Sequence, residues 1–294
     1  MKKKKNEIKL FCEFVIPPIL IWASIVVIPL IYGIYLTFTN WNGLSPNYDL
    51  VGFSNYAAIF TDKTFLSSLW KTFVYVFFVV VFSNVLGLAL ALLLTYGIKL
   101  QGLFRTCFFA ANMIGGVVMG YIWNYIFSFA LTKVGAVTGW GLLQKSWLTS
   151  PGTALVALIV VAVWQLSGYL MVIYVAGLTN VSKDMLEAAK IDGAGPLQRV
   201  KAVTFPAMKP VITFSLIMAL GNILNNDFEQ ILLFYNSAVY EVGDVIDTWV
   251  YRVGLGQMQY GVGSAVSMLK AVISLVLILS ANKISKKATG RGMF

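Results

Sequence analysis

The sequence predicts an all-α membrane protein with six transmembrane helices. The first indication is its amino-acid composition. Of the 294 residues, 59% are hydrophobic and only 12% are charged, whereas about 25% of the residues in a soluble globular chain are charged. The run from Phe78 to Leu94 contains only Ser83 and Asn84 as polar side chains, and about 20 such helical residues span a bilayer. The alternating pattern of a transmembrane β-strand is not seen.

Six apolar runs carry the predicted spans. The first run follows a lysine-rich start, and it is longer than the apolar region of a signal peptide, which has about 7–15 residues, so we interpret it as a retained helix. The spans are predicted at Phe14–Phe38, Phe73–Tyr96, Thr106–Phe129, Ala154–Leu178, Val211–Leu233 and Gly261–Asn282. The segments between them are short, so residues 1–294 are expected to form a single transmembrane domain.

The basic residues predict the orientation of these spans. Most of them lie before the first span, after the second, after the fourth and after the sixth, and few lie in the other connecting segments. Lysine and arginine accumulate on the cytoplasmic side of membrane proteins. Both termini are therefore expected in the cytoplasm of a bacterial cell, and the chain in its cytoplasmic membrane. A reporter that is active only outside the membrane should work after Asp62 and be silent after Gln101.

Several kinds of chemistry are not supported by the sequence. It contains no histidine, and its two cysteines, Cys12 and Cys107, are far apart and outside any Cys-x-x-Cys motif, so neither a metal site nor a catalytic site is expected. The phosphate-binding motif Gly-x-x-x-x-Gly-Lys-Ser/Thr is absent. The net charge of +10 does not indicate a nucleic-acid partner, because the basic residues alternate with apolar spans instead of forming one soluble face.

The connecting segment at about 180–210 is the most informative part of the chain. Ser182 is a good helix N-cap, and Asp192-Gly193 is a turn signal. Pro196 suits the first turn of a second helix, and Pro206 is expected to end that helix. We therefore predict two short helices joined by a tight bend.

This bend is either an ordinary amphipathic connector or a docking element for another protein. Small residues would allow a partner surface to approach closely, and acidic residues would orient that surface by charge. The residues with these two roles are Glu187, Ala188, Ala189, Asp192, Gly193 and Ala194.

A family resemblance favours the docking element. The run Glu187-Ala-Ala-x-x-Asp192-Gly-Ala, followed by Val203-x-Phe-Pro206 and Pro210, resembles the signature loop of ABC importer permeases. Val200 and Val203 stand where that family usually has Phe and Ile. The resemblance implies the ABC type I importer permease fold, with the loop seated in a groove of a cytoplasmic ATPase.

Other stretches are similar to the carbohydrate permeases of this family. They are Asn40-Trp41, the run from Val51 to Tyr56, the run from Arg105 to Trp123, and the run from Asn222 to Tyr260. The resemblance implies import of a sugar or oligosaccharide, without naming one sugar. It also implies a second homologous permease, two ATPase subunits carrying ATP and Mg²⁺, and an extracytoplasmic solute-binding protein, with no cofactor on this chain.

Polar and aromatic residues in the fourth and fifth spans are candidates for the substrate path. Sugars bind to planar hydrogen-bonding groups and to aromatic faces, and amides are costly against lipid. The candidates are Trp164, Gln165, Tyr169, Asn222, Asn225, Asn226 and Glu229. The alternative is that these amides bond neighbouring helices. Lys270, inside the last span, either extends its amine to the membrane surface or faces the path.

Other readings of the whole chain remain open. The loop also fits an importer permease for a non-sugar solute. A secondary transporter is less consistent with the sequence, because such proteins use intramembrane acids or histidines and Lys270 is the clear intramembrane charge here. A scaffold subunit without transport would leave the loop signature unexplained.

Overall fold

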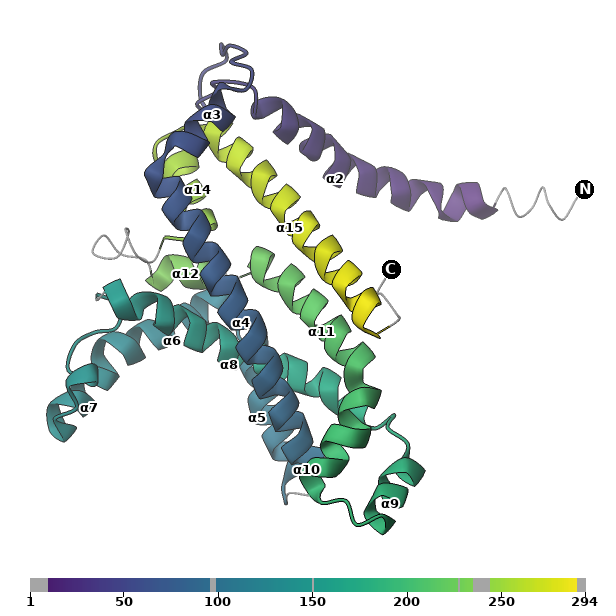
Figure 1. Cartoon of the computed structure of the whole chain (residues 1–294). Helices are drawn as coiled ribbons and strands as arrows, with labels where there is room; N and C mark the ends of the chain where they lie inside the picture. Colours follow the sequence, from purple (N-terminus) through teal and green to yellow (C-terminus); the bar gives the residue numbers. More distant parts are fainter. Residues whose placement is uncertain (1–9, 96–98, 150, 227, 235–243, 290–294) are drawn as a thin grey trace, which may run out of the picture. The chain divides into compact units, whose positions relative to one another are not determined.

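The computed structural model describes residues 10–95, 99–149, 151–226, 228–234 and 244–289, and this part of the chain is nearly all helical (Figure 1). The side chains of residues 151, 222–226, 288 and 289 lie outside the description. Within the described residues, six helices are long and apolar enough to cross a membrane: Leu10–Leu36, Lys63–Thr95, Gly116–Thr138, Gly152–Leu178, Pro196–Gly221 and Tyr260–Lys287. The predicted number of spans is confirmed.

The backbone groups into two compact units, which are described separately. The first unit comprises Met1–Leu66 and Trp249–Val272, and the second comprises Ser67–Thr248 and Ile273–Phe294. The helices α4 (Lys63–Thr95), α14 (Ile246–Val250) and α15 (Tyr260–Thr289) contribute residues to both.

The first unit contains α2 (Ile16–Leu36), α3 (Ser54–Thr61) and the π-helix η4 (Tyr251–Gly256). The loop between α2 and α3 is tied down by the buried Asn55, whose amide donates to the carbonyls of Thr37 and Thr39, both at 2.8 Å. Trp41 in the same loop packs on Tyr260, with ring centroids 5.5 Å apart. These contacts give the loop a defined shape at the start of α15.

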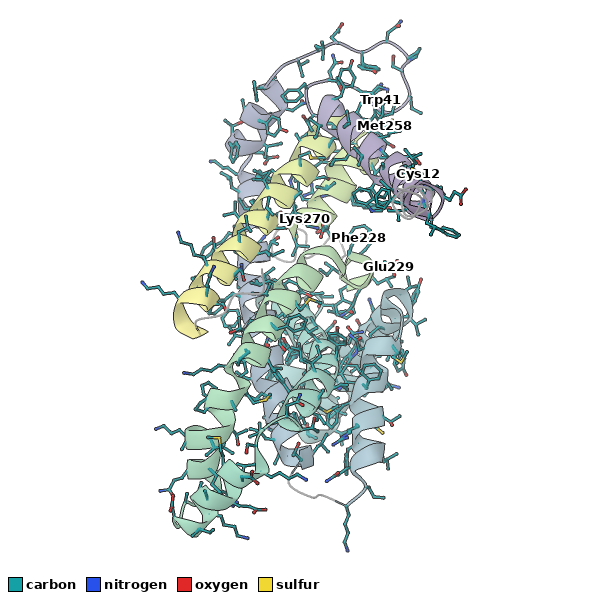
Figure 2. The ribbon with its side chains drawn as sticks, turned by 90° about the vertical axis from the view of Figure 1, so that its right-hand side faces the viewer. Cys12, Trp41, Phe228, Glu229, Met258 and Lys270 are labelled. Carbon is teal, nitrogen blue, oxygen red and sulfur yellow. The ribbon has the colours of Figure 1, made fainter. Side chains whose placement is uncertain are left out.

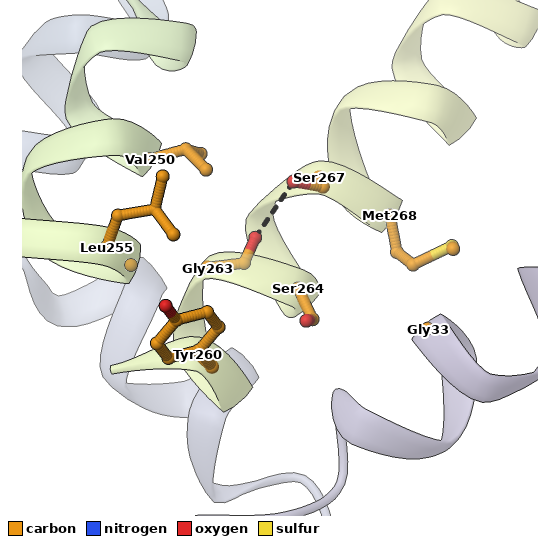
Figure 3. A pocket seen from close by; sticks show the side chains of 9 residues that line it. Gly33, Val250, Leu255, Tyr260, Gly263, Ser264, Ser267 and Met268 are labelled. Atoms are coloured by element: carbon orange, nitrogen blue, oxygen red, sulfur yellow. Dashed lines mark hydrogen bonds between the residues drawn. The ribbon is translucent and has the colours of Figure 1, made fainter. Parts of the chain in front are cut away.

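A pocket of about 310 Å³ lies in the first unit, between α2, η4 and α15 (Figure 3). Small and apolar residues line it, and the hydroxyl of Ser267 donates to the carbonyl of Gly263 at 2.9 Å. An added Cβ on Gly263 would lie 3.0 Å from the Cα of Gly254, so η4 and α15 approach closely where both lack a side chain.

The second unit is built around α8 (Pro151–Leu178). It also contains α5 (Gln101–Met113), α6 (Gly116–Tyr125), the π-helix η1 (Ile126–Ala130), α7 (Leu131–Thr138) and the 3₁₀-helix η2 (Gly141–Leu143). After α8 come α9 (Lys183–Ile191), α10 (Pro196–Arg199), the π-helix η3 (Val200–Thr204), α11 (Phe205–Asn226) and α12 (Phe228–Phe234). Half of the most apolar stretch of α8 is buried by other parts of the chain.

The third predicted span is wrong in one respect, because it is not continuous. The helix predicted at Thr106–Phe129 is broken after Met113, where Ile114 and Gly115 adopt extended backbone with ψ of 125° and 148°. Adjacent glycines lower the helix propensity at this point. The spanning helix is Gly116–Thr138, and α5 is a separate helix packed on α8.

The fifth span also begins earlier than predicted. Pro206 was expected to end a short helix, but it is the second residue of α11, and Pro210 also lies inside that helix. The π-helical turn η3 ends at Thr204, two residues before Pro206. A π-helical turn shifts the backbone hydrogen bonds by one residue. The helix can then continue through a proline, which has no N–H to donate.

Candidate functional site

The α9–α10 segment, Lys183–Arg199, has the two-helix shape that its sequence predicts. Ser182 caps α9 by accepting a hydrogen bond from the Met185 N–H at 3.4 Å, and Asp184 lies in the favourable first turn. Pro196 occupies the first turn of α10. Figure 1 shows both helices at the start of α11, so the segment leads directly into a membrane-spanning helix.

The bend between α9 and α10 is a Schellman C-cap. Gly193 has a φ of +82°, and its N–H donates to the Lys190 carbonyl at 3.1 Å, while the Ala194 N–H donates to the Ala189 carbonyl at 2.9 Å. This is the hydrogen-bond pattern that closes a helix with a left-handed residue. An added Cβ on Gly193 would meet nothing within 4 Å, so this position needs glycine for its backbone angle and not for space.

Exposed apolar side chains border this bend, and the sequence interpretation did not single them out. Ile191 is 86% exposed and Leu197 is 84% exposed, with Met185 at 58%. Among the predicted docking residues, Glu187, Ala188, Asp192 and Gly193 are exposed, whereas Ala189 and Ala194 are half-buried. The signal that could have identified Ile191 and Leu197 is an isolated apolar residue on each side of the Asp-Gly turn. Both side chains therefore lie at the protein surface, one on each side of the bend.

The candidate path residues of α8 contact α5 and α6. Trp164 packs edge-on against Trp123, with ring centroids 5.6 Å apart. The Gln165 amide donates to the Ala111 backbone carbonyl of α5 at 3.4 Å. Tyr169 is half-buried against the core. The contacts with Trp123 and Ala111 could not be read from the sequence, because each joins two different predicted spans.

Trp123 belongs to an aromatic cluster that links four elements. Its ring stacks on Phe127 at 5.3 Å, and Phe127 in turn contacts Trp147 at 5.6 Å and Phe234 at 6.1 Å. The indole N–H of Trp123 is buried and, within the described part of the chain, has no hydrogen-bond partner. A buried donor of this kind is unusual in a folded protein.

The short helix α12 docks on a glycine stripe of α6. Glu229 is exposed (Figure 2), and its carboxylate would lie 3.3 Å from a Cβ added at Gly116, the first residue of α6. One turn further on, a Cβ on Gly120 would lie 2.8 Å from the Cβ of Leu233. The Asn124 amide then donates to the Leu233 carbonyl at 2.9 Å. Gln165 on α8 therefore bonds α5, before the break at Ile114–Gly115, and Glu229 on α12 lies beside Gly116, after the break.

The assignment of all eight candidates to the substrate path stays a prediction. Asn222, Asn225 and Asn226 lie in the last turns of α11, but their side chains are outside the described residues. Residue 227 is also outside them, so a common face of these asparagines with Glu229 is untested. Lys270 is half-buried on α15 and belongs to the first unit.

Comparison with known proteins identifies the class of this chain. Residues 83–289 match the family described as binding-protein-dependent transport system inner membrane component. Because the match covers more than half of the chain, the chain belongs to this family and is a multi-pass protein of the cytoplasmic membrane.

Two relatives and one solved structure are similar over nearly the full length. The probable starch degradation products transport system permease protein of Thermoanaerobacterium thermosulfurigenes is 35% identical over 90% of this chain and 88% of its own. The multiple sugar-binding transport system permease protein of Streptococcus mutans is 30% identical over 93% and 94%. A chain of a bacterial ABC transporter that imports the acidic polysaccharide alginate aligns with a TM-score of 0.85, 25% identity and 98% coverage of both chains.

Proposed function

We propose that this chain is a permease subunit of an ATP-driven importer that carries a sugar or oligosaccharide into the cytoplasm. The two relatives and the solved transporter named above handle starch degradation products, multiple sugars and alginate, and these substrates support a carbohydrate over a non-sugar solute. The family description names a binding-protein-dependent system, and the alginate importer has also been solved with a periplasmic protein that holds a pentasaccharide. An extracytoplasmic sugar-binding protein is the partner proposed here.

The α9–α10 segment is the observation that carries the proposal of ATP coupling. The chain has no phosphate-binding motif of its own, so ATP and Mg²⁺ are assigned to two separate ATPase subunits. Glu187, Ala188 and Asp192 are exposed, and Ile191 and Leu197 project beside them. Apolar anchors within a polar rim are typical of protein interfaces. This surface is proposed to enter a groove of the ATPase and to transmit its movement to α11.

The orientation follows from the same proposal. The α9–α10 segment must be cytoplasmic to meet an ATPase, which agrees with the basic residues of the connecting segment at about 180–210 (Lys183, Lys190, Arg199, Lys201 and Lys209) and with the basic residues near both termini. The reporter fusions after Asp62 and Gln101 test this orientation, and reporter activity after Gln101 would contradict it.

A second, similar permease is proposed to complete the substrate pathway. In the present chain, Trp164, Gln165, Tyr169 and Glu229 are assigned to that pathway.

Gly193 offers a direct test in proteoliposomes that hold the complete importer. Gly193→Val forces a β-branched residue into left-handed backbone, which costs about 1–2 kcal/mol, and should distort the bend. Asparagine tolerates this conformation, so Gly193→Asn is the matched control. We expect Gly193→Val to lose both sugar uptake and the ATP hydrolysis that the binding protein stimulates, while Gly193→Asn keeps most of each.

Two results would contradict the proposal. If the unmodified importer takes up no oligosaccharide with ATP and binding protein present, the assignment to sugar import is wrong. If the importer that carries Gly193→Val hydrolyses ATP and imports sugar at the normal rate, the α9–α10 segment is an ordinary connector.

A further inference from the structure

The short helix α3 presents an apolar face that this chain leaves largely uncovered. Phe53 directly precedes α3, and the Ala57 N–H donates to its carbonyl at 3.0 Å, so the helical spacing already begins at Phe53. Phe53, Ala57 and Phe60 are four and three residues apart, which places them on one side of the helix. Phe53 is 74% exposed and Phe60 is 53% exposed. Phe53, Ala57 and Phe60 together form the apolar face of α3.

The opposite side of α3 is fixed to its surroundings within the first unit. Residues two apart on a helix are separated by about 200°, so the buried Asn55 and Ile59 lie roughly opposite the apolar face. The hydrogen bonds from the Asn55 amide to the carbonyls of Thr37 and Thr39 are on this side. A Cβ added at Gly261, near the start of α15, would lie 3.1 Å from the Asn55 amide nitrogen, so α15 packs closely here. The apolar face is therefore held outward, because turning it inward would break these contacts.

The hydrogen bonds of Asn55 also set the level of α3 relative to the membrane. The spanning segment Leu10–Leu36 has 27 residues, which makes it about 40 Å long. The hydrocarbon core of a bilayer is about 30 Å thick, and the bilayer with its headgroups is about 40–45 Å thick. This segment therefore ends among the headgroups. Thr37 follows it directly, and because Asn55 bonds the Thr37 carbonyl, α3 lies at the same level.

Aromatic residues mark this level independently. Tyr32 and Tyr35 lie in the last two turns of α2 and are exposed, with ring centroids 6.4 Å apart. Tyr35 contacts Tyr48 with ring centroids 6.4 Å apart, and Tyr48 contacts Trp41 with ring centroids 6.1 Å apart. Tyrosine and tryptophan concentrate where the hydrocarbon meets water, because their rings are apolar and their O–H and N–H groups are polar. This row of aromatic residues is therefore expected at the membrane surface where α2 ends.

We propose that α3 is an interfacial helix whose apolar face lies in lipid, at the boundary between the headgroups and the acyl chains. Apolar side chains at this depth leave water for the acyl region. The face carries no polar or charged side chain that a protein partner could bond. It also continues the surface of the spanning segment that ends at Leu36, none of whose most apolar stretch is buried in this chain. Because Asn55 joins α3 to the end of α2 and to the start of α15, contact with lipid holds both of these ends at one depth. Such an anchor requires only that the chain spans a membrane, and it is independent of the cargo.

Two adjacent alanines provide a matched test of this position. Ala57 belongs to the apolar face, whereas Ala58 lies one turn after Ser54 on another side of the helix, and both alanines are exposed. Ala57→Cys and Ala58→Cys are each made with Cys12→Ser and Cys107→Ser, and the introduced cysteine carries a nitroxide spin label. The full-length chain is placed in lipid nanodiscs with the subunits that copurify, and the signal of the background without the introduced cysteine is subtracted. Electron paramagnetic resonance then measures how often the label collides with oxygen, which dissolves in lipid, and with a water-soluble nickel chelate.

We expect the label in Ala57→Cys to collide mainly with oxygen and to lose most of its contact with the nickel chelate, while the label in Ala58→Cys keeps its contact with the chelate. Equal contact with the chelate at both positions would place α3 in water and overturn the proposal. Low contact with both reagents in Ala57→Cys would mean that a protein partner covers the apolar face, which also overturns it. Phe60→Cys and Thr61→Cys form a second pair of the same design if either alanine variant fails to assemble.

Discussion

The helices α2 and α8 have almost the same apolar character but very different surroundings. Each belongs to a spanning segment of 27 residues with similar mean hydropathy. None of the most apolar stretch of the first is buried in this chain, whereas half of that stretch is buried in the second. Hydropathy therefore predicts that a helix enters the membrane, but it does not predict whether lipid or protein surrounds the helix, because lipid tails are as apolar as leucine.

Small and polar residues account for the difference. On α8, Gly168 and Gly177 let α5 and α11 approach closely, and Tyr174 bonds α4. On α2, large side chains such as Ile25 and Ile28 are more than 60% exposed. We expect lipid or the proposed second permease to cover this surface of α2 in the assembled importer.

The largest expected effect comes from filling a glycine contact. A Cβ on Gly168 would lie 2.7 Å from the Phe108 carbonyl carbon and closer still to its oxygen, so Gly168→Val should destabilise the chain by about 3 kcal/mol or more. On α2, a Cβ on Gly33 would meet only the terminal methyl of Met268 at 3.6 Å, so Gly33→Ala should change stability by less than about 0.5 kcal/mol. Unfolding in mixed micelles by a denaturing detergent measures both, and equal values would remove the contrast between the two helices.

A smaller effect is expected when apolar side chains are shortened. Leu170 on α8 is 0% exposed, whereas Ile25 on α2 is 68% exposed. Leu170→Ala should lower the free energy of unfolding by about 2–5 kcal/mol, because it leaves a cavity. Ile25→Ala should lower it by less than about 1 kcal/mol, because surrounding lipid or detergent fills the space. The same unfolding measurement applies, and a large loss for Ile25→Ala would show that α2 is packed within this chain.

The smallest effect is expected for the serines that bond their own helix. Ser24 on α2 donates to the Ile21 carbonyl at 2.8 Å, and Ser167 on α8 donates to the Trp164 carbonyl at 2.9 Å. Replacing either by alanine should cost less than about 1 kcal/mol, because these carbonyls are helical acceptors and no helix–helix bond is lost. A thermal-unfolding series in detergent would sharpen the comparison, and a large loss for Ser167→Ala alone would mean that its hydroxyl also serves a neighbour.

The bend of the α9–α10 segment shows where sequence reasoning succeeds. Ser182, Gly193 and Pro196 act through local backbone geometry, so their roles follow from neighbouring residues alone. The same local reasoning failed at Pro206. The preceding π-helical turn shifts the backbone hydrogen bonds, so the helix continues through the proline instead of ending there. At the candidate path, the sequence selected Trp164 and Gln165 but not Trp123, whose contact with Trp164 depends on packing between two spans.

The number of spans, the two-helix shape of the α9–α10 segment and the family could be predicted from the sequence, because hydropathy, capping and a contiguous motif are properties of neighbouring residues. The sequence did not predict which spans are buried, where the third span breaks, or how α12 lies on Gly116 and Gly120. These features depend on close packing in a membrane, which matches small residues from distant parts of the chain. Such a match, like the hydrogen bond from Tyr174 on α8 to Asn84 on α4, exists only once the helices are brought together.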